Sequence, residues 1–215
     1  MAKEVYQDWV DYYRVKGLSG KSHKEISGYD HPLAQLTQRG LQDLIDKISR
    51  HLSLKASDKL LDVGCGAGLI TKELTDKVAM TVGLDATREM ILHAPRPIQG
   101  VEGLAHKLPF QAQTFDKVLC HSVFQYFPDH QYAQAVVEDF LRVMAPNGIC
   151  LIQDLPDMAK RDPYFQVKVP DSHNLTRLFY EKSWFKELFP AAQVFDQEIS
   201  DYENSKYRFN VLIRI

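Results

Sequence analysis

The sequence predicts an α/β fold with a doubly wound sheet, and the main evidence is one glycine-rich segment. The apolar residues Leu60–Val63 have the length and composition of a buried strand end. Three glycines follow at alternate positions: Gly64, Gly66 and Gly68. Apolar residues at helical spacing begin at Leu69, so the predicted order is strand, tight turn and helix.

A glycine-rich turn of this kind can bind a ligand through its backbone. Without a Cβ, the chain can bend sharply and a ligand can lie directly against it. The N–H groups of the turn and the helix start favour an electronegative ligand group. A second strand, Thr81–Leu84, ends at Asp85, one helix and one strand after the turn. We expect the Asp85 carboxylate to accept the two hydroxyls of a ribose; the alternative is a solvent-exposed acid at a strand end.

The segment Asp62–Gly68 resembles the first motif of class I S-adenosylmethionine (SAM) dependent methyltransferases. A dinucleotide site would have its third glycine one residue later, in the order G-x-G-x-x-G. Three further segments resemble later motifs of the family in the same order: Asp85–Met90, Gly103–Phe110 and Phe115–Asp129. The resemblance covers residues 60–146 and is greatest to small-molecule methyltransferases of the UbiE-like group.

The resemblance implies that SAM is the cofactor. The positions that match the family's cofactor-binding residues are Asp62, Gly64, Cys65, Gly66, Gly68, Asp85, Ala86, Met90, Leu104, Ala105 and His121. Leu104 stands where the family usually has an acid that accepts from the adenine amine, so we expect backbone and apolar contacts around Ala105 to hold the ring. Met90 would pack on the adenine edge; its alternative is ordinary core packing.

The resemblance also implies a Rossmann-like sheet of seven strands, whose last two form an antiparallel hairpin at the edge. These two strands are expected at Gln193–Ile199 and Tyr207–Ile213. We interpret residues 1–215 as a single methyltransferase domain. Its parts would be an N-terminal helical cap at 1–54, a SAM-binding core at 55–154, and a substrate-side insertion with the C-terminal strands at 155–215.

Aromatic residues crowd the N-terminus, where Tyr6, Trp9 and Tyr13 have helical spacing. This segment is predicted to be a lid over the cofactor that contributes substrate contacts; the alternative is an ordinary amphipathic helix packed on the sheet. The residues proposed for the lid or the substrate site are Tyr12, Tyr13, Tyr29 and Gln125.

Methyl transfer requires donor sulfur, methyl group and nucleophile to be held in line with water excluded. His121 is the first candidate for a catalytic base, because it follows the fourth predicted strand at the carboxyl edge where ligands bind in open α/β sheets. It could instead contact the cofactor through its backbone, or be a partly buried histidine bonded to main chain. Tyr126 is the second catalytic candidate; Gln125 and Tyr126 occupy positions where many small-molecule members carry two histidines.

Composition excludes several classes of function. The chain of 215 residues has a net charge of −2 and no long basic run, which argues against nucleic-acid binding. No apolar run is long enough to cross a membrane, and the charged N-terminus lacks a signal peptide's apolar segment. Its three cysteines are widely spaced and predict reduced thiols in a cytoplasmic protein, without a metal site. We expect a monomer or homodimer.

The sequence therefore predicts a SAM-dependent methyltransferase that acts on the oxygen or nitrogen of a small molecule. Two alternatives remain open at this point. One is a dinucleotide-dependent oxidoreductase, and the other is a non-catalytic member of the fold that binds SAM or a partner protein.

Overall fold

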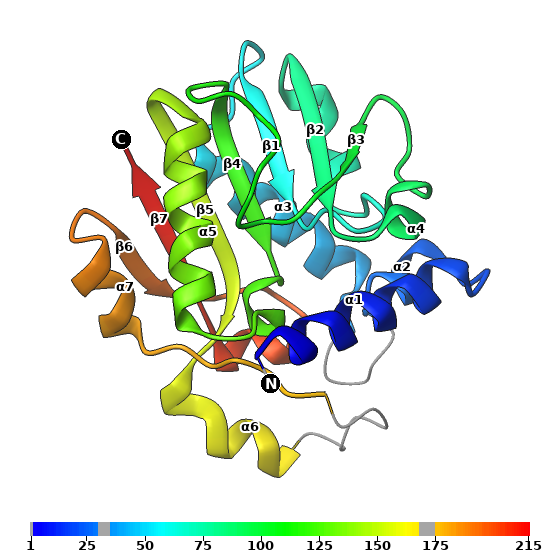
Figure 1. Cartoon of the computed structure of the whole chain (residues 1–215), viewed down its shortest axis with the longest axis vertical. Helices are drawn as coiled ribbons and strands as arrows, with labels where there is room; N and C mark the ends of the chain where they lie inside the picture. The colour runs from blue at the N-terminus through cyan, green and yellow to red at the C-terminus, as the bar shows by residue number, and fades with distance from the viewer. Residues whose placement is uncertain (1, 30–34, 168–174) are drawn as a thin grey trace.

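The computed structural model describes residues 2–29, 35–167 and 175–215. Its centre is a seven-stranded sheet in the order β3-β2-β1-β4-β5-β7-β6 (Figure 1). The strands are β1 Lys59–Val63, β2 Met80–Asp85, β3 Gln99–Glu102, β4 Phe115–His121, β5 Met144–Pro156, β6 Gln193–Asp196 and β7 Arg208–Arg214. Strands β1 to β5 pair in parallel, whereas β7 is antiparallel to both β5 and β6. The predicted Rossmann-like sheet with an antiparallel C-terminal pair is confirmed.

Helical segments connect and cover the strands. The α-helices are α1 Ala2–Leu18, α2 His23–Ile26, α3 Gln38–Leu52, α4 Arg88–Ile91, α5 His130–Val143, α6 Arg161–Val167 and α7 Lys182–Leu188. Short 3-10 helices are η1 Thr71–Lys77, η2 Phe124–Tyr126, η3 Met158–Lys160 and η4 Glu203–Tyr207. No helix in the described part of the chain has the length and apolar character needed to span a bilayer.

The alternation of side chains along the strands produces two apolar layers. Leu61, Cys120 and Phe209 belong to the core cluster that includes the buried residues of α5 and α7. Their chain neighbours Leu60 and Leu119 belong to the cluster that includes α3. Because successive strand residues point to opposite faces, one strand set serves both layers. Figure 1 shows α5 in front of the sheet and α3 behind it.

Some element boundaries differ from the sequence prediction. The helix after the glycine turn is the 3-10 helix η1, and it begins at Thr71 rather than at the turn itself. The apolar spacing from Leu33 to Leu54 predicts one helix over that range. In the structure α3 begins at Gln38, where the Thr37 hydroxyl accepts a hydrogen bond from Gly40 N at 3.0 Å; residues 30–34 lie outside the described residues. The sequence predicts a helix over Tyr180–Phe189 with Ser183 as a candidate cap. Helix α7 instead has Glu181 at its N-cap, so Ser183 lies inside the helix.

The N-terminal helices lie near the carboxyl ends of the parallel strands, where α1 crosses below β1 and β4 in Figure 1. Helix α1 contacts both α4 and η2. Ligands in open α/β sheets bind outside the carboxyl ends of the strands. The fold therefore brings the aromatic N-terminal helix to the edge of the sheet that carries the glycine turn.

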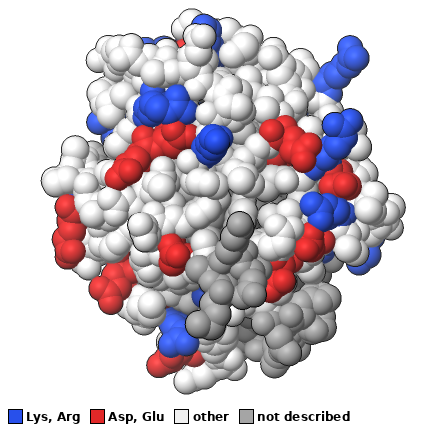
Figure 2. Space-filling view, viewed as in Figure 1, with Lys and Arg blue, Asp and Glu red and all other residues white. Residues whose placement is uncertain are grey.

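The charged side chains do not gather on the face shown in Figure 2. Lysines and arginines there are interspersed with aspartates and glutamates. A mixed surface of this kind does not provide the continuous basic stripe that follows a phosphate backbone.

Candidate functional site

The glycine turn has a backbone that requires glycine. Gly64, Gly66 and Gly68 have φ values of +76°, +55° and +78°, a region that strains any residue with a Cβ. Gly64 N and Cys65 N donate to the Leu84 carbonyl at 2.7 and 3.0 Å, which ties the turn to β2. A Cβ on Gly64 would lie 2.3 Å from Val123 Cγ2, so the turn also packs closely against the segment after β4.

Asp85 is fixed beside this turn. One carboxylate oxygen accepts from Gly66 N at 2.9 Å, and the other accepts from Thr87 N at 2.9 Å and Thr87 Oγ1 at 2.8 Å. Burial raises the pKa of Asp85, although these hydrogen bonds oppose the shift. The carboxylate is therefore oriented by backbone N–H groups next to the turn, and it does not project into solvent.

Asp62 is a second acid next to the turn, and it is buried, with 4% of its surface exposed. The Thr71 hydroxyl donates to it at 2.5 Å. Burial raises the pKa of Asp62 to about 7; the Thr71 hydrogen bond lowers it, and the negative charge of Asp85 adds to the rise. Two carboxylates in one site, of which Asp62 is buried, favour a ligand that carries positive charge.

A cavity of about 140 Å³ lies over the turn. The predicted site residues that line it are Asp62, Gly64, Cys65, Gly66, Asp85, Ala86, Met90, Ala105, His121, Tyr13, Tyr29 and Tyr126. They come from β1, β2, β4, α1, α4, η2 and the loops next to these elements. The structure thus brings together most of the predicted cofactor-binding residues and both catalytic candidates.

Four predicted residues do not line this cavity. Gly68 packs instead against Ile98 and Pro95, and a Cβ there would lie 3.0 Å from Ile98 Cδ1. Leu104 is 39% exposed, and Tyr12 lies outside the residues that enclose the cavity. Gln125 is buried, and its amide donates to the Ser122 carbonyl and hydroxyl at 3.0 and 2.9 Å.

Helix α1 covers the cavity with aromatic side chains. Tyr6, Trp9 and Tyr13 all line it. The Tyr13 and Tyr126 hydroxyls lie 2.6 Å apart, and Trp9 Nε1 donates to the Thr176 carbonyl at 2.9 Å. These contacts join α1 to η2 and to the segment before α7. Tyr6 and Trp9 were not among the predicted site residues, although they line the cavity; their helical spacing with Tyr13, three to four residues between neighbours, was the available signal.

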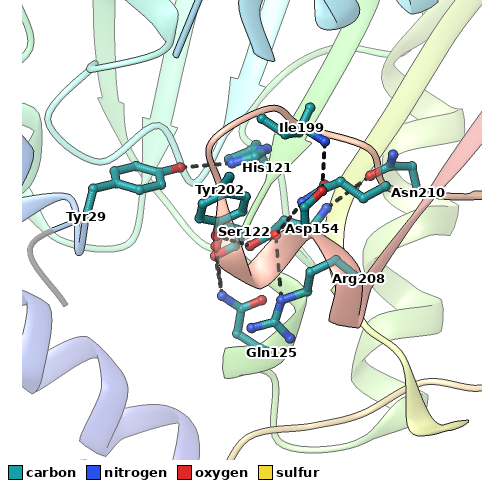
Figure 3. Close-up of polar contacts among 11 residues, drawn as sticks. Tyr29, His121, Ser122, Gln125, Asp154, Ile199, Tyr202, Arg208 and Asn210 are labelled. Carbon is teal, nitrogen blue, oxygen red and sulfur yellow. Dashed lines mark hydrogen bonds and ion pairs between the residues drawn. The ribbon is translucent and has the colours of Figure 1, made fainter. Parts of the chain in front are cut away.

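His121 ends β4 and is 7% exposed. Its Nε2 lies 2.9 Å from the Tyr29 hydroxyl (Figure 3). Burial lowers the pKa of His121, while the charge of Asp154 opposes this shift, so the imidazole is neutral near pH 7. A neutral imidazole at the cavity wall can accept a proton. The contact between Tyr29 and His121 could not be predicted from the sequence, because nothing in the spacing of the two residues indicates it.

The residues present fit a nucleoside joined to an amino acid. The glycine turn leaves space that a Cβ would fill at Gly66, where it would lie 3.3 Å from Met90 Cε. Asp85 offers carboxylate oxygens at the end of β2, and apolar residues around Ala105 line the same cavity. No cluster of three or more potential metal ligands occurs among the residues that the structure describes. The fold and this site define a class of protein that binds an adenosine-containing cofactor in a doubly wound sheet.

Comparison with known proteins identifies the family. Residues 61–152 match the model of a methyltransferase domain. The uncharacterized methyltransferase YcgJ of Bacillus subtilis is 29% identical over 160 residues, which cover 69% of this chain and 61% of that protein. The demethylmenaquinone methyltransferase of Bacillus licheniformis is 28% identical, with 81% of this chain and 79% of that protein covered. The chain spans 3–65% of the length of the first three curated relatives.

A solved structure supports the same fold. The N-methyltransferase NodS of Bradyrhizobium japonicum, in complex with S-adenosylhomocysteine, superposes with a TM-score of 0.67 at 15% identity. It covers 94% of this chain and 97% of its own. The chain belongs to the class I SAM-dependent methyltransferases, and the cofactor of this family is SAM. Family membership decides against the dinucleotide-dependent oxidoreductase.

Proposed function

We propose that this protein transfers the methyl group of SAM to an oxygen or nitrogen atom of a small-molecule acceptor. The observation that carries the proposal is one cavity that holds the glycine turn and Asp85 together with His121 and the aromatic residues of α1. SAM supplies the activated methyl group when bound. The remaining wall, which includes Ser122 and Tyr126, then faces the acceptor.

In this proposal each group has a separate role. The glycine turn and Asp85 bind the ribose and the adjoining part of the cofactor. Asp62 favours its positively charged amino-acid part. The aromatic side chains of α1 exclude water from the reacting atoms. His121 Nε2 receives the acceptor's proton through the Tyr29 hydroxyl, which lines the cavity and contacts that nitrogen.

Isothermal titration calorimetry with S-adenosylhomocysteine tests the cofactor assignment, with NADH as the comparison ligand. We expect S-adenosylhomocysteine to bind with a dissociation constant on the order of 1 to 100 μM and NADH not to compete. Incubation with methyl-labelled SAM and pools of small hydroxy and amino compounds then tests transfer. Absence of S-adenosylhomocysteine binding would refute the proposal. Binding without transfer to any acceptor would favour the non-catalytic alternative.

The raised pKa of Asp62 gives a pH dependence for cofactor binding. A positively charged ligand group nearby favours ionised Asp62, so binding should lower its pKa from about 7 and release a proton. The affinity for S-adenosylhomocysteine should therefore rise as the pH approaches about 7 from below and level off above that value. Calorimetry in buffers of different ionisation enthalpy measures the protons released. In Asp62→Asn this slope should disappear; an unchanged slope would assign the proton to another group.

A further inference from the structure

A buried glutamine on β5 lies next to His121 on β4. Gln153 and His121 are register partners in the parallel pair of these two strands. Two positions earlier, Leu119 and Leu151 are also partners, and both belong to the apolar cluster that includes α3. Because strand side chains alternate between the two faces of a sheet, His121 and Gln153 project to that same face. The Gln153 amide therefore lies beside the His121 ring.

Three buried polar atoms lie together at this place. His121 is 7% exposed and Gln153 is 1% exposed. His121 Nδ1 and both Oε1 and Nε2 of Gln153 have no hydrogen bond to any other described residue. The second ring nitrogen, His121 Nε2, lies 2.9 Å from the Tyr29 hydroxyl (Figure 3). Buried polar groups in folded proteins are nearly always paired, so the amide and Nδ1 pair with each other.

The direction of the pKa shift indicates which amide atom pairs with the ring. Burial lowers the pKa of His121; the charge of Asp154 and a hydrogen bond with the Gln153 side chain raise it, and the charge of Arg208 lowers it. A hydrogen bond raises the pKa of an imidazole when it stabilises the protonated ring, in which both nitrogens donate. The partner of Nδ1 is then an acceptor, and the acceptor atom of the Gln153 amide is Oε1.

The neutral imidazole has two tautomers, and only one of them leaves His121 Nε2 able to take a proton. With Gln153 Oε1 toward the ring, Nδ1 carries the hydrogen and the Nε2 lone pair accepts from the Tyr29 hydroxyl. With the amide NH₂ group toward the ring, Nδ1 would be the acceptor and Nε2 would carry the hydrogen. The hydrogen bond at one ring nitrogen thus decides the chemistry of the other.

Resting on the proposed function for the role of His121, we propose that Gln153 is a positioning residue for this base. Its Oε1 accepts from His121 Nδ1–H and directs the Nε2 lone pair toward the Tyr29 hydroxyl. As the acceptor atom bonds to the methyl carbon and the sulfur–carbon bond breaks, the acceptor's bond to hydrogen also breaks. Tyr29 takes that proton and gives its own to Nε2. Gln153 then stabilises the imidazolium, because Nδ1–H remains bonded to Oε1.

The charged and titratable groups around His121 do not select the tautomer. Asp154 on β5 and Arg208 on β7 form a buried pair, with Arg208 Nε 3.6 Å from the carboxylate, and their effects on the pKa of His121 are opposite. Tyr202, next to η4, donates to Asp154 at 3.3 Å, and Asp62 on β1 lines the same cavity as His121. Among the described residues, neither Tyr202 nor Asp62 hydrogen-bonds the ring.

Long-range ¹H–¹⁵N NMR of the histidine rings reads the tautomer directly and needs no methyl acceptor. The full ¹⁵N-labelled chain is titrated with acid and base, with and without S-adenosylhomocysteine. The chain has eight histidines, and the His121 signal is the one missing from His121→Gln. We expect a neutral ring that is protonated at Nδ1 and bare at Nε2. A neutral ring protonated at Nε2 would overturn the inference, and this reading requires no variant at Gln153.

Two substitutions of Gln153 separate positioning from packing. Gln153→Leu should lower the ratio of the Nδ1–H to the Nε2–H tautomer by about tenfold, because the buried Nδ1–H loses its acceptor. It should also lower the pKa of His121. Gln153→Glu supplies a carboxylate acceptor, so it should keep the Nδ1–H tautomer and raise the pKa of His121 above that of the unsubstituted protein. A side chain that only fills space would change neither quantity.

Gln197→Leu is the matched control. It removes another buried amide, whose Nε2 donates to Asp154 at 2.9 Å. The tautomer ratio of His121 should stay within about twofold. Thermal melting verifies that each variant is folded. An unchanged ratio in folded Gln153→Leu, or an equal change in Gln197→Leu, would show that Gln153 does not position the ring.

Calorimetry on the same samples keeps the two proposals apart. Gln153 does not line the cavity, so Gln153→Leu should change the affinity for S-adenosylhomocysteine by less than about twofold. If the unsubstituted protein failed to bind S-adenosylhomocysteine, the proposed function would be wrong, whereas the tautomer measured without ligand would still decide the contact between Gln153 and His121. If the protein bound S-adenosylhomocysteine but His121 carried its hydrogen on Nε2, only the inference about Gln153 would be wrong.

Discussion

Asp85→Ala should lower the affinity for S-adenosylhomocysteine by about two to four orders of magnitude. Each hydrogen bond from a ribose hydroxyl to a carboxylate contributes about 1.5–3 kcal/mol, and Asp85 is expected to accept two of them. The substitution also removes the acceptor of Gly66 N at 2.9 Å, which orients the glycine turn. Calorimetry measures the affinity, and circular dichroism with thermal melting verifies that the variant is folded.

The matched control for this substitution is Glu102→Ala. Glu102 is the register partner of Asp85 on the neighbouring strand β3, but its side chain is exposed and lines no part of the cavity. Glu102→Ala removes the same charge as Asp85→Ala at the same edge of the sheet. It should change the affinity for S-adenosylhomocysteine by less than about threefold. Equal losses in the two variants would mean that long-range charge, and not contact with the ribose, explains the effect of Asp85.

Gly64→Ala should lower the free energy of unfolding by about 2–5 kcal/mol and abolish measurable cofactor binding. The left-handed backbone contributes about 1–2 kcal/mol of strain, and the overpacking against Val123 contributes about 1–3 kcal/mol. The added Cβ would lie 2.3 Å from Val123 Cγ2, so either the turn or the segment after β4 must move. Urea unfolding and calorimetry measure the two effects.

Two variants separate strain from overpacking at Gly64. Gly20 also has a left-handed backbone, φ +68°, but has no atom within 4 Å of an added Cβ. Gly20→Ala should therefore show the backbone strain alone, about 1–2 kcal/mol. The double variant Gly64→Ala/Val123→Ala should recover part of the loss in Gly64→Ala. If Gly64→Ala were no more destabilising than Gly20→Ala, the close packing of the turn against Val123 would be disproved.

The glycine turn and its acid could be predicted because their signals are local. Three alternating glycines after an apolar strand need positive φ values, and the structure has all three. The distance from Gly64 to Asp85 along the chain is set by one helix and one strand, which the parallel pairing of β1 and β2 requires. The order of the motifs then indicated the family and its sheet.

The same motif matching did not show which matched positions face the ligand. Gly68 matched the motif, but its backbone turns toward Ile98 and Pro95. Leu104 matched in position but is partly exposed at the surface. A motif gives the order of residues along the chain; which of them line a cavity depends on how neighbouring segments pack on the turn.

The contacts around His121 join distant parts of the chain. Tyr29 lies 92 residues before His121, and the Tyr13–Tyr126 pair is separated by 113 residues. No periodicity along the chain relates the two residues of either pair. Their proximity depends on how the N-terminal helical segment packs against the segment at the end of β4. The buried pair of Asp154 and Arg208 likewise exists only because β7 lies antiparallel beside β5.

The sequence by itself determined the sheet, the glycine turn with its acid, and the family, since backbone conformation and strand spacing are properties of short segments. The tertiary structure alone decided which aromatic residues cover the cavity, which hydroxyl contacts His121, and which buried amide lies beside its ring. The physical reason is that those features depend on burial and on the meeting of segments far apart in the chain, which only the packed fold defines.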